Sequence, residues 1–277
     1  MHTCYVCAPG SPGRIYTPAP VGGHLARVPA RFAGPPGRAN GGVATGALIC
    51  PALADAARKP GAAHLVAARV TARLHRALPL ERDVVVTSAG DGPREVTLHV
   101  GEPVITGAVH LMASAGALRP GDAIADVPPE HVDTLAALVR VAPPDRPSVF
   151  EETGEHPIPG CFSCGTENPT GLAIHPRAVE DGTVCAPWTP AAEFDDGGGA
   201  LAQMVIAAAL DCVSGIALPV RMQRELLGED RFYVLGSYDV SFLRVAPVDR
   251  AYRVAGRMLR RDGRKFFALS VLSRERV

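Results

Sequence analysis

Residues 200–218, ALAQMVIAAALDCVSGIAL, decide the fold. Apolar side chains continue around every side of this predicted helix, and only Gln203 and Asp211 interrupt its interior. A helix that is apolar on all sides is buried, so we expect a central helix wrapped by a sheet. No run in the chain reaches the roughly 18 uninterrupted apolar residues that a membrane span needs.

Strand-like segments surround this helix. Short strands are expected at 171–175 and 183–188 before it, and three long strands follow at 231–244, 250–260 and 265–274. Asp262-Gly263 indicates the hairpin between the last two.

The first half of the chain has the same order of elements. Asn40 is a good N-cap for the apolar run 43–57, which Pro51 should kink or split and Pro60-Gly61 should end. One strand is expected before this helix and four after it, with Asp91-Gly92 as a hairpin signal; the five ranges are 23–29, 65–74, 83–88, 94–100 and 104–112.

The repeated order indicates duplication of one α+β unit. We place a Pro/Gly-rich lead-in at 1–30, the first unit at 31–115 and the second at 161–277. A proline-rich linker joins them at 116–160, with a short helix near 129–139. Each unit matches the description of a hotdog fold, a long central helix in a curled antiparallel sheet, and two in tandem would pack as a pseudo-dimer.

Bulk properties narrow the class of protein. The 277 residues are 47% hydrophobic, which is enough for a full core, and they carry 28 basic and 28 acidic residues. This balance and the lack of a basic stripe argue against nucleic acid as a partner. The N-terminus lacks the pattern of a signal peptide, and seven cysteines in a core-rich chain suit reduced thiols, so we expect a cytoplasmic protein.

Three motifs carry a resemblance to a known family. Residues 161–172, CFSCGTENPTGL, resemble the opening segment of many hotdog thioesterase domains. Residues 208–215, AALDCVSG, resemble the part of the hotdog helix that bears the acid. Residues 34–42, GPPGRANGG, resemble the loop that opens that helix, where many relatives have His-Gly-Gly. Together the chain resembles actinobacterial double-hotdog proteins of the acyl-CoA thioesterase type over 31–112 and 161–275.

The resemblance implies hydrolysis of an acyl thioester, carried by coenzyme A or an acyl carrier protein, without a cofactor. Asp211 would be the general base or nucleophile, and the Gly41 and Gly42 amides would stabilise the oxyanion. Asn40 would orient substrate or water. Four further residues within these motifs are expected to contact substrate; they are Arg38, Cys212, Ser214 and Gly215. A homodimer of double-hotdog units is a further expected assembly.

The two halves are asymmetric. In the family, the acid works with the glycine pair of the opposite unit. The acid position of the first half falls at Ile49 or Cys50, and the glycine position of the second falls at Ala202-Gln203. The sequence therefore predicts one composite site, from Asn40-Gly41-Gly42 and Asp211, at the seam where the two halves of the chain meet. The equivalent position on the other side of this seam should lack catalytic groups.

Other interpretations stay open. The site could bind acyl groups without catalysis, or serve a dehydratase or other lyase, although no histidine is well placed for the latter. Asn40-Gly41-Gly42 could be only a cap and turn, and Asp211 only a structural acid. Two CxxC pairs, Cys4 with Cys7 and Cys161 with Cys164, could together hold one zinc ion, although relatives with the second pair generally need no metal. No Gly-x-Ser-x-Gly motif indicates a serine hydrolase.

Overall fold

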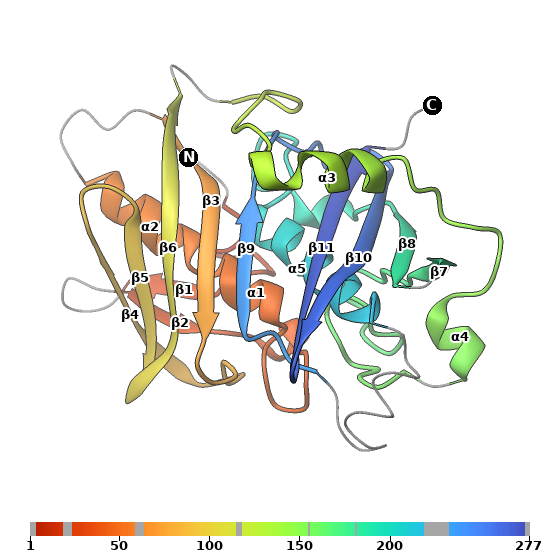
Figure 1. Ribbon diagram of the computed structural model, residues 1–277. Coiled ribbons are helices and arrows are strands. Elements are labelled where there is room, and N and C mark those ends of the chain that lie inside the picture. Colours follow the sequence, from red (N-terminus) through yellow and green to blue (C-terminus); the bar gives the residue numbers. More distant parts are fainter. Residues whose placement is uncertain are drawn as a thin grey trace.

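The computed structural model describes residues 4–18, 24–58, 64–114, 118–154, 156–180, 182–218 and 233–274. The helix end expected at Pro60-Gly61 and the start of the strand expected at 231–244 lie outside these ranges. Figure 1 shows the two halves side by side, with the N-terminal strands on one side and β10 and β11 on the other.

The first central helix is split, as predicted, into α1 (Gly41–Gly46) and α2 (Ile49–Ala56). Pro51 lies in the first turn of α2. At this position a helix needs no hydrogen bond from the residue's nitrogen, so proline fits once α2 begins anew.

A seven-stranded antiparallel sheet packs on this helix pair in the order β1-β2-β4-β5-β6-β3-β9. Six of its strands come from the first half: β1 (Tyr16–Pro18), β2 (His24–Arg27), β3 (His64–Leu74), β4 (Asp83–Ala89), β5 (Arg94–Val100) and β6 (Glu102–Ser114). The seventh, β9 (Ser237–Ser241), comes from the second half and pairs with β3. This pairing joins the halves, and the Arg69–Asp239 ion pair reinforces it.

The second central helix is α5 (Gln203–Ile216), and it packs against a four-stranded sheet in the order β11-β10-β8-β7. The strands are β7 (Arg177–Glu180), β8 (Thr183–Trp188), β10 (Tyr252–Asp262) and β11 (Lys265–Arg274). Each half therefore has a buried helix under an antiparallel sheet, which is the α+β double unit expected from the sequence.

The strand predicted at 171–175 is wrong. Leu172 and Ile174 donate their amides to Phe162 O (2.7 Å) and Ser163 O (3.0 Å), so this segment binds the loop of the second CxxC pair rather than a neighbouring strand. The apolar side chains of its alternating pattern, Leu172 and Ile174, are buried in the same core cluster as Phe162 of that loop. β9 is also shorter than predicted, because beyond Ser241 the chain pairs with residues 122–125 of the linker.

The helix predicted at 129–139 is confirmed as the 3-10 turn η2 (Pro129–His131) followed by α3 (Val132–Leu138). A helix that was not predicted, α4 (Val149–Thr153), follows in the linker. Two further 3-10 turns, η1 (Ala30–Phe32) and η3 (Ala192–Phe194), precede the two central helices. None of the helices in the described ranges is long and apolar enough to cross a membrane.

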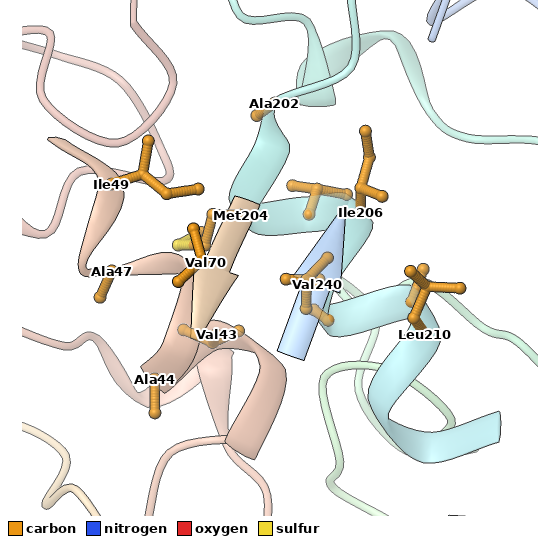
Figure 2. Packing of buried hydrophobic residues seen from close by; sticks show 14 of the residues in the cluster. Val43, Ala44, Ala47, Ile49, Val70, Ala202, Met204, Ile206, Leu210 and Val240 are labelled. Carbon is orange, nitrogen blue, oxygen red and sulfur yellow. The ribbon is translucent and has the colours of Figure 1, made fainter. Parts of the chain in front are cut away.

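The two central helices cross at very close range (Figure 2). A Cβ atom on Gly42 would lie 2.3 Å from Ala207 O, and one on Gly46 would lie 2.6 Å from Met204 Cα. Real side-chain carbons do not come this close to backbone, so only glycine permits the crossing. This contact brings the start of α1 against the middle of α5.

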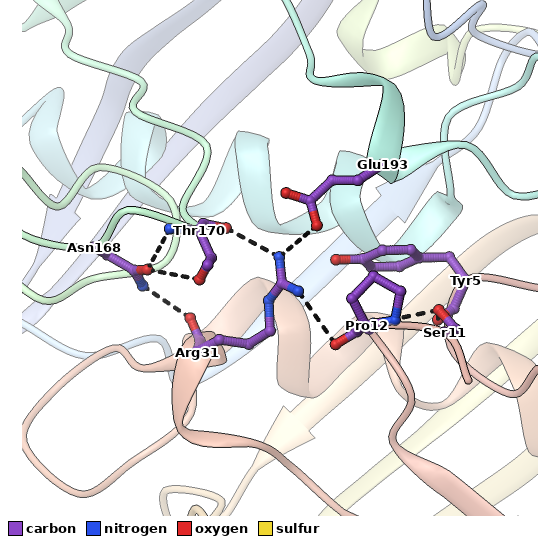
Figure 3. Close-up of polar contacts among 8 residues, drawn as sticks. Tyr5, Ser11, Pro12, Arg31, Asn168, Thr170 and Glu193 are labelled. Carbon is purple, nitrogen blue, oxygen red and sulfur yellow. Dashed lines mark hydrogen bonds and ion pairs between the residues drawn. The ribbon is translucent and has the colours of Figure 1, made fainter. Parts of the chain in front are cut away.

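Polar and aromatic contacts close the seam beside the crossing. Tyr5, Phe32, Phe162 and Phe194 form edge-to-face pairs with centroids 4.8 to 6.5 Å apart. Next to them, Arg31 bonds Glu193 (2.9 Å) and the Thr170 carbonyl (3.3 Å), both in the second half (Figure 3). The seam is thus packed and hydrogen-bonded.

Candidate functional site

The acid and the glycine pair meet across the seam. The Gly42 amide donates a hydrogen bond to Asp211 Oδ2 at 2.8 Å. A Cβ on Gly41 would lie 3.0 Å from the same oxygen, so the backbone at Gly41 faces the carboxylate directly. The structure therefore places together three of the residues that the sequence proposed as one composite site.

Burial perturbs this carboxylate. Desolvation raises the pKa of Asp211 to about 7, although the Gly42 amide opposes the rise. The nearby Cys161 adds to it. The residue as a whole is only partly buried. A carboxyl group with a pKa near neutrality can exchange protons at physiological pH, which is what a general base requires.

Asn40 caps the first central helix. Its Oδ1 accepts from the Val43 amide at 3.0 Å, which confirms the predicted N-cap of α1. Its Nδ2 faces the sulfurs of Cys212 (3.5 Å) and Cys161 (3.8 Å). The residue is only 2% exposed. Both ends of the side chain are therefore engaged inside the protein, and Asn40 holds the helix start in place; its orienting of substrate stays a prediction.

The remaining predicted residues divide between surface and interior. Arg38 is exposed two residues before the cap, and Gly215 is exposed on α5. The Ser214 hydroxyl donates to the Asp211 carbonyl at 2.7 Å, so it is occupied by its own helix. The Cys212 and Cys161 sulfurs are within hydrogen-bond distance of each other, at 3.4 Å. Of the four, only Arg38 and Gly215 are freely accessible.

Sequence reasoning missed Tyr238 and Leu235. The Tyr238 hydroxyl donates to the Ala207 carbonyl at 3.2 Å, and the negative charge of Asp211 adds to the burial that raises the pKa of Tyr238. Leu235 fills the space of a Gly41 side chain, because a Cβ atom on Gly41 would lie 2.9 Å from Leu235 Cβ. Both belong to the segment around β9, whose crossing to the first sheet no local pattern announces.

The pseudo-symmetric position has no acid. Asp211 lies nine residues after the N-cap Ala202 of α5, and Ile49 lies nine residues after the N-cap Asn40 of α1. Ile49 is 4% exposed and lies in the apolar core with Met204 (Figure 2). Gln203, in the place of Gly41, bonds the Ala67 carbonyl at 2.7 Å. This seam position is filled with packed side chains.

The cysteines gather differently from the single zinc site considered from the sequence. Cys4 and Cys7 group with Cys50 of α2, whereas Cys161 and Cys164 group with Cys212 of α5. The four CxxC cysteines thus belong to two separate clusters, because each pair lies over the central helix of its own half. Either cluster has the donors of a thiolate metal site.

The chain matches no protein-family model and no curated protein sequence. Its fold does match solved structures. A tesB protein from Mycobacterium avium subspecies paratuberculosis superposes with a TM-score of 0.55 at 13% identity, covering 94% of this chain and 89% of that one. A protein of unknown function with a hotdog fold from Alicyclobacillus acidocaldarius gives 0.51 at 16% identity, over 93% and 88%. An acyl-CoA thioesterase II from Mycobacterium marinum gives 0.50 at 14% identity, over 94% and 88%. The predicted double-hotdog fold is confirmed over most of the chain.

Proposed function

We propose that the chain hydrolyses an acyl thioester of coenzyme A or an acyl carrier protein at the Asp211 site. The observation that carries this proposal is the 2.8 Å contact between the Asp211 carboxylate of one half and the Gly42 amide at the helix start of the other. The names of two structural neighbours, a tesB protein and an acyl-CoA thioesterase, are in keeping with it.

In the proposed reaction, ionised Asp211 takes a proton from a water molecule, and the water oxygen attacks the thioester carbonyl. The carbonyl oxygen becomes an oxyanion, which the Gly41 and Gly42 amides can bind once Asp211 is protonated and releases them. The C–S bond then breaks, the thiolate takes up a proton, and a carboxylic acid and a free thiol are released. Direct attack by the Asp211 carboxylate, through an anhydride that water then cleaves, gives the same products.

One observation favours a second candidate, acyl binding without turnover. The Gly42 amide, expected to serve the oxyanion, already donates to Asp211. The Gly41 amide also hydrogen-bonds Asp211. If both bonds persisted with substrate bound, neither amide would remain for the oxyanion, and the site would stabilise the transition state poorly.

A panel of acyl-CoA thioesters, followed by detection of the released thiol, separates the two candidates. We expect turnover in the wild type and a loss of at least a hundredfold in kcat for Asp211→Asn, which keeps the side chain's shape. Asp145→Asn, a change at an exposed linker position, is the matched control. Saturable acyl-CoA binding with no thiol release in the wild type would replace hydrolysis by the binding function. Unchanged turnover in Asp211→Asn would remove Asp211 from the reaction.

A further inference from the structure

A second cluster of reactive groups lies in the N-terminal part of the seam, apart from the Asp211 site. The Cys4 sulfur is 2.9 Å from that of Cys7 and 3.6 Å from that of Cys50, and all three sulfurs lie within 4.8 Å of one another. The three residues are partly buried. We call Cys4, Cys7 and Cys50 the N-terminal thiol triad.

A carboxylate from the other half of the molecule lies beside the cluster, although its oxygens are not within 4.8 Å of all three sulfurs. Asp196, in the loop before α5, accepts the Tyr5 amide at 2.7 Å through Oδ1 and hydrogen-bonds the Cys4 thiol. No basic side chain among the described residues forms an ion pair with it. A partly buried carboxylate beside thiols is stabilised when a cation neutralises it.

We propose that Cys4, Cys7 and Cys50 bind one zinc ion, with Asp196 as the fourth ligand once its side chain turns toward the ion. Zinc takes four ligands in a tetrahedron and accepts both thiolate and carboxylate donors. With Zn–S bonds of about 2.3 Å, the sulfurs of such a site lie about 3.8 Å apart, close to the Cys4–Cys50 separation; the Cys4–Cys7 pair would open by somewhat less than 1 Å. A carboxylate among the donors favours zinc over copper(I), which selects soft ligands throughout.

The cysteine cluster of the other half of the chain supplies an internal comparison. Around Cys161, Cys164 and Cys212, the polar group that faces the sulfurs is the Asn40 amide, through Nδ2, whereas the nearby Asp211 accepts from the Gly42 amide. An N–H donor in this place stabilises a thiolate but cannot ligate a metal. The proposal therefore concerns the N-terminal thiol triad, where zinc would fasten the N-terminal segment, α2 and the loop before α5.

The test measures metal content in the full chain, purified without a histidine tag in the presence of a reductant and supplied with zinc chloride. We expect Cys50→Ser to lower bound zinc by one equivalent per chain, and Cys212→Ser, the matching position in the other half, to leave it unchanged. Zinc unaltered by Cys50→Ser, or lost in Cys212→Ser instead, would overturn the assignment. So would a zinc-free wild type, including one in which mass spectrometry finds a Cys4–Cys7 disulfide.

Two further measurements guard against a misfolded variant. Asp196→Asn keeps all three thiols, and we expect it to weaken zinc binding at least tenfold while the far-ultraviolet circular dichroism stays that of the wild type. Cobalt(II) in place of zinc should give thiolate charge-transfer bands and tetrahedral d–d bands, and the d–d bands should shift in Asp196→Asn. Zinc affinity and cobalt spectra identical to the wild type would exclude Asp196 as a ligand. Thioester hydrolysis enters none of these readouts, so this proposal and the proposed function fail independently.

Discussion

Replacing Asp211 by asparagine should make the protein more stable at alkaline pH while it removes the proposed activity. The pKa of Asp211 is raised from an ordinary 3.8 to about 7 by burial. This difference of about three pH units corresponds to about 4 kcal/mol, because each unit is worth about 1.4 kcal/mol. Asparagine has nearly the shape of the protonated acid, its carbonyl can still accept from the Gly42 amide, and it never carries the charge.

The sign of the pH dependence follows from proton binding. Between pH 4 and pH 7 the folded protein keeps the Asp211 proton, whereas the unfolded chain releases it, so the wild type loses stability as pH rises through this window and levels off above pH 7. The variant has no such loss at this position. Its advantage in unfolding free energy should therefore be about 1 to 2 kcal/mol at pH 5 and about 4 kcal/mol at pH 8.

Urea denaturation followed by circular dichroism at pH 5 and pH 8 measures this advantage for the variant. Comparing the two proteins at each pH cancels the titration of every other group. Asp145→Asn, at an exposed position, is the control for the same substitution outside the site. An Asp211→Asn advantage that is equal at both pH values, or larger at pH 5, would refute the account of a carboxylate perturbed by burial.

Three further predictions concern the same seam. The kcat/KM for thioester hydrolysis should rise about tenfold per pH unit below pH 7 and level off above it, as Asp211 ionises, which initial rates from pH 5 to 9 would show. Gly42→Ala should cost about 3 kcal/mol or more of unfolding free energy, because its Cβ would lie 2.3 Å from Ala207 O, whereas Gly215→Ala, with open space around it, should be neutral or slightly stabilising in the same urea titration. Tyr238→Phe should cost about 1 kcal/mol through its lost bond to Ala207 O, and thermal unfolding would detect it as a fall of a few degrees in Tm.

Local chemistry predicted most of the elements, and partners distant in sequence account for the errors. Pro51 divided the first central helix as its missing N–H requires, and Asn40 capped it. The segment 171–175 had a strand-like pattern but found its hydrogen bonds in the loop of the second CxxC pair. β9 was expected in its own half, but it pairs with β3 of the first. Propensity and periodicity do not encode such partners.

In the candidate site too, some residues were predictable from the sequence and others depend on partners distant in the chain. The pairing of Asp211 with Gly41-Gly42 was expected from the family resemblance, and the structure brings them together. The residues around them could not be found in this way. Asn40 turns its amide toward sulfur because Cys161 and Cys212 lie above the cap, and Cys50 joins a CxxC pair that ends 43 residues earlier. Spacing rules for metal ligands act over short intervals and miss a donor that the fold delivers from a helix.

The asymmetry of the two seam positions has an energetic reason. A second aspartate at the place of Ile49 would be a second buried carboxylate, and by the pKa of Asp211 each costs about 4 kcal/mol at neutral pH. That amount is a large part of the 5 to 15 kcal/mol that typically holds a protein folded. With Ile49 and Met204 in the core, the same position instead gains from apolar burial. One half thus carries the acid and the other the glycines that contact it, so at these two related positions the cost of a perturbed carboxylate is borne once.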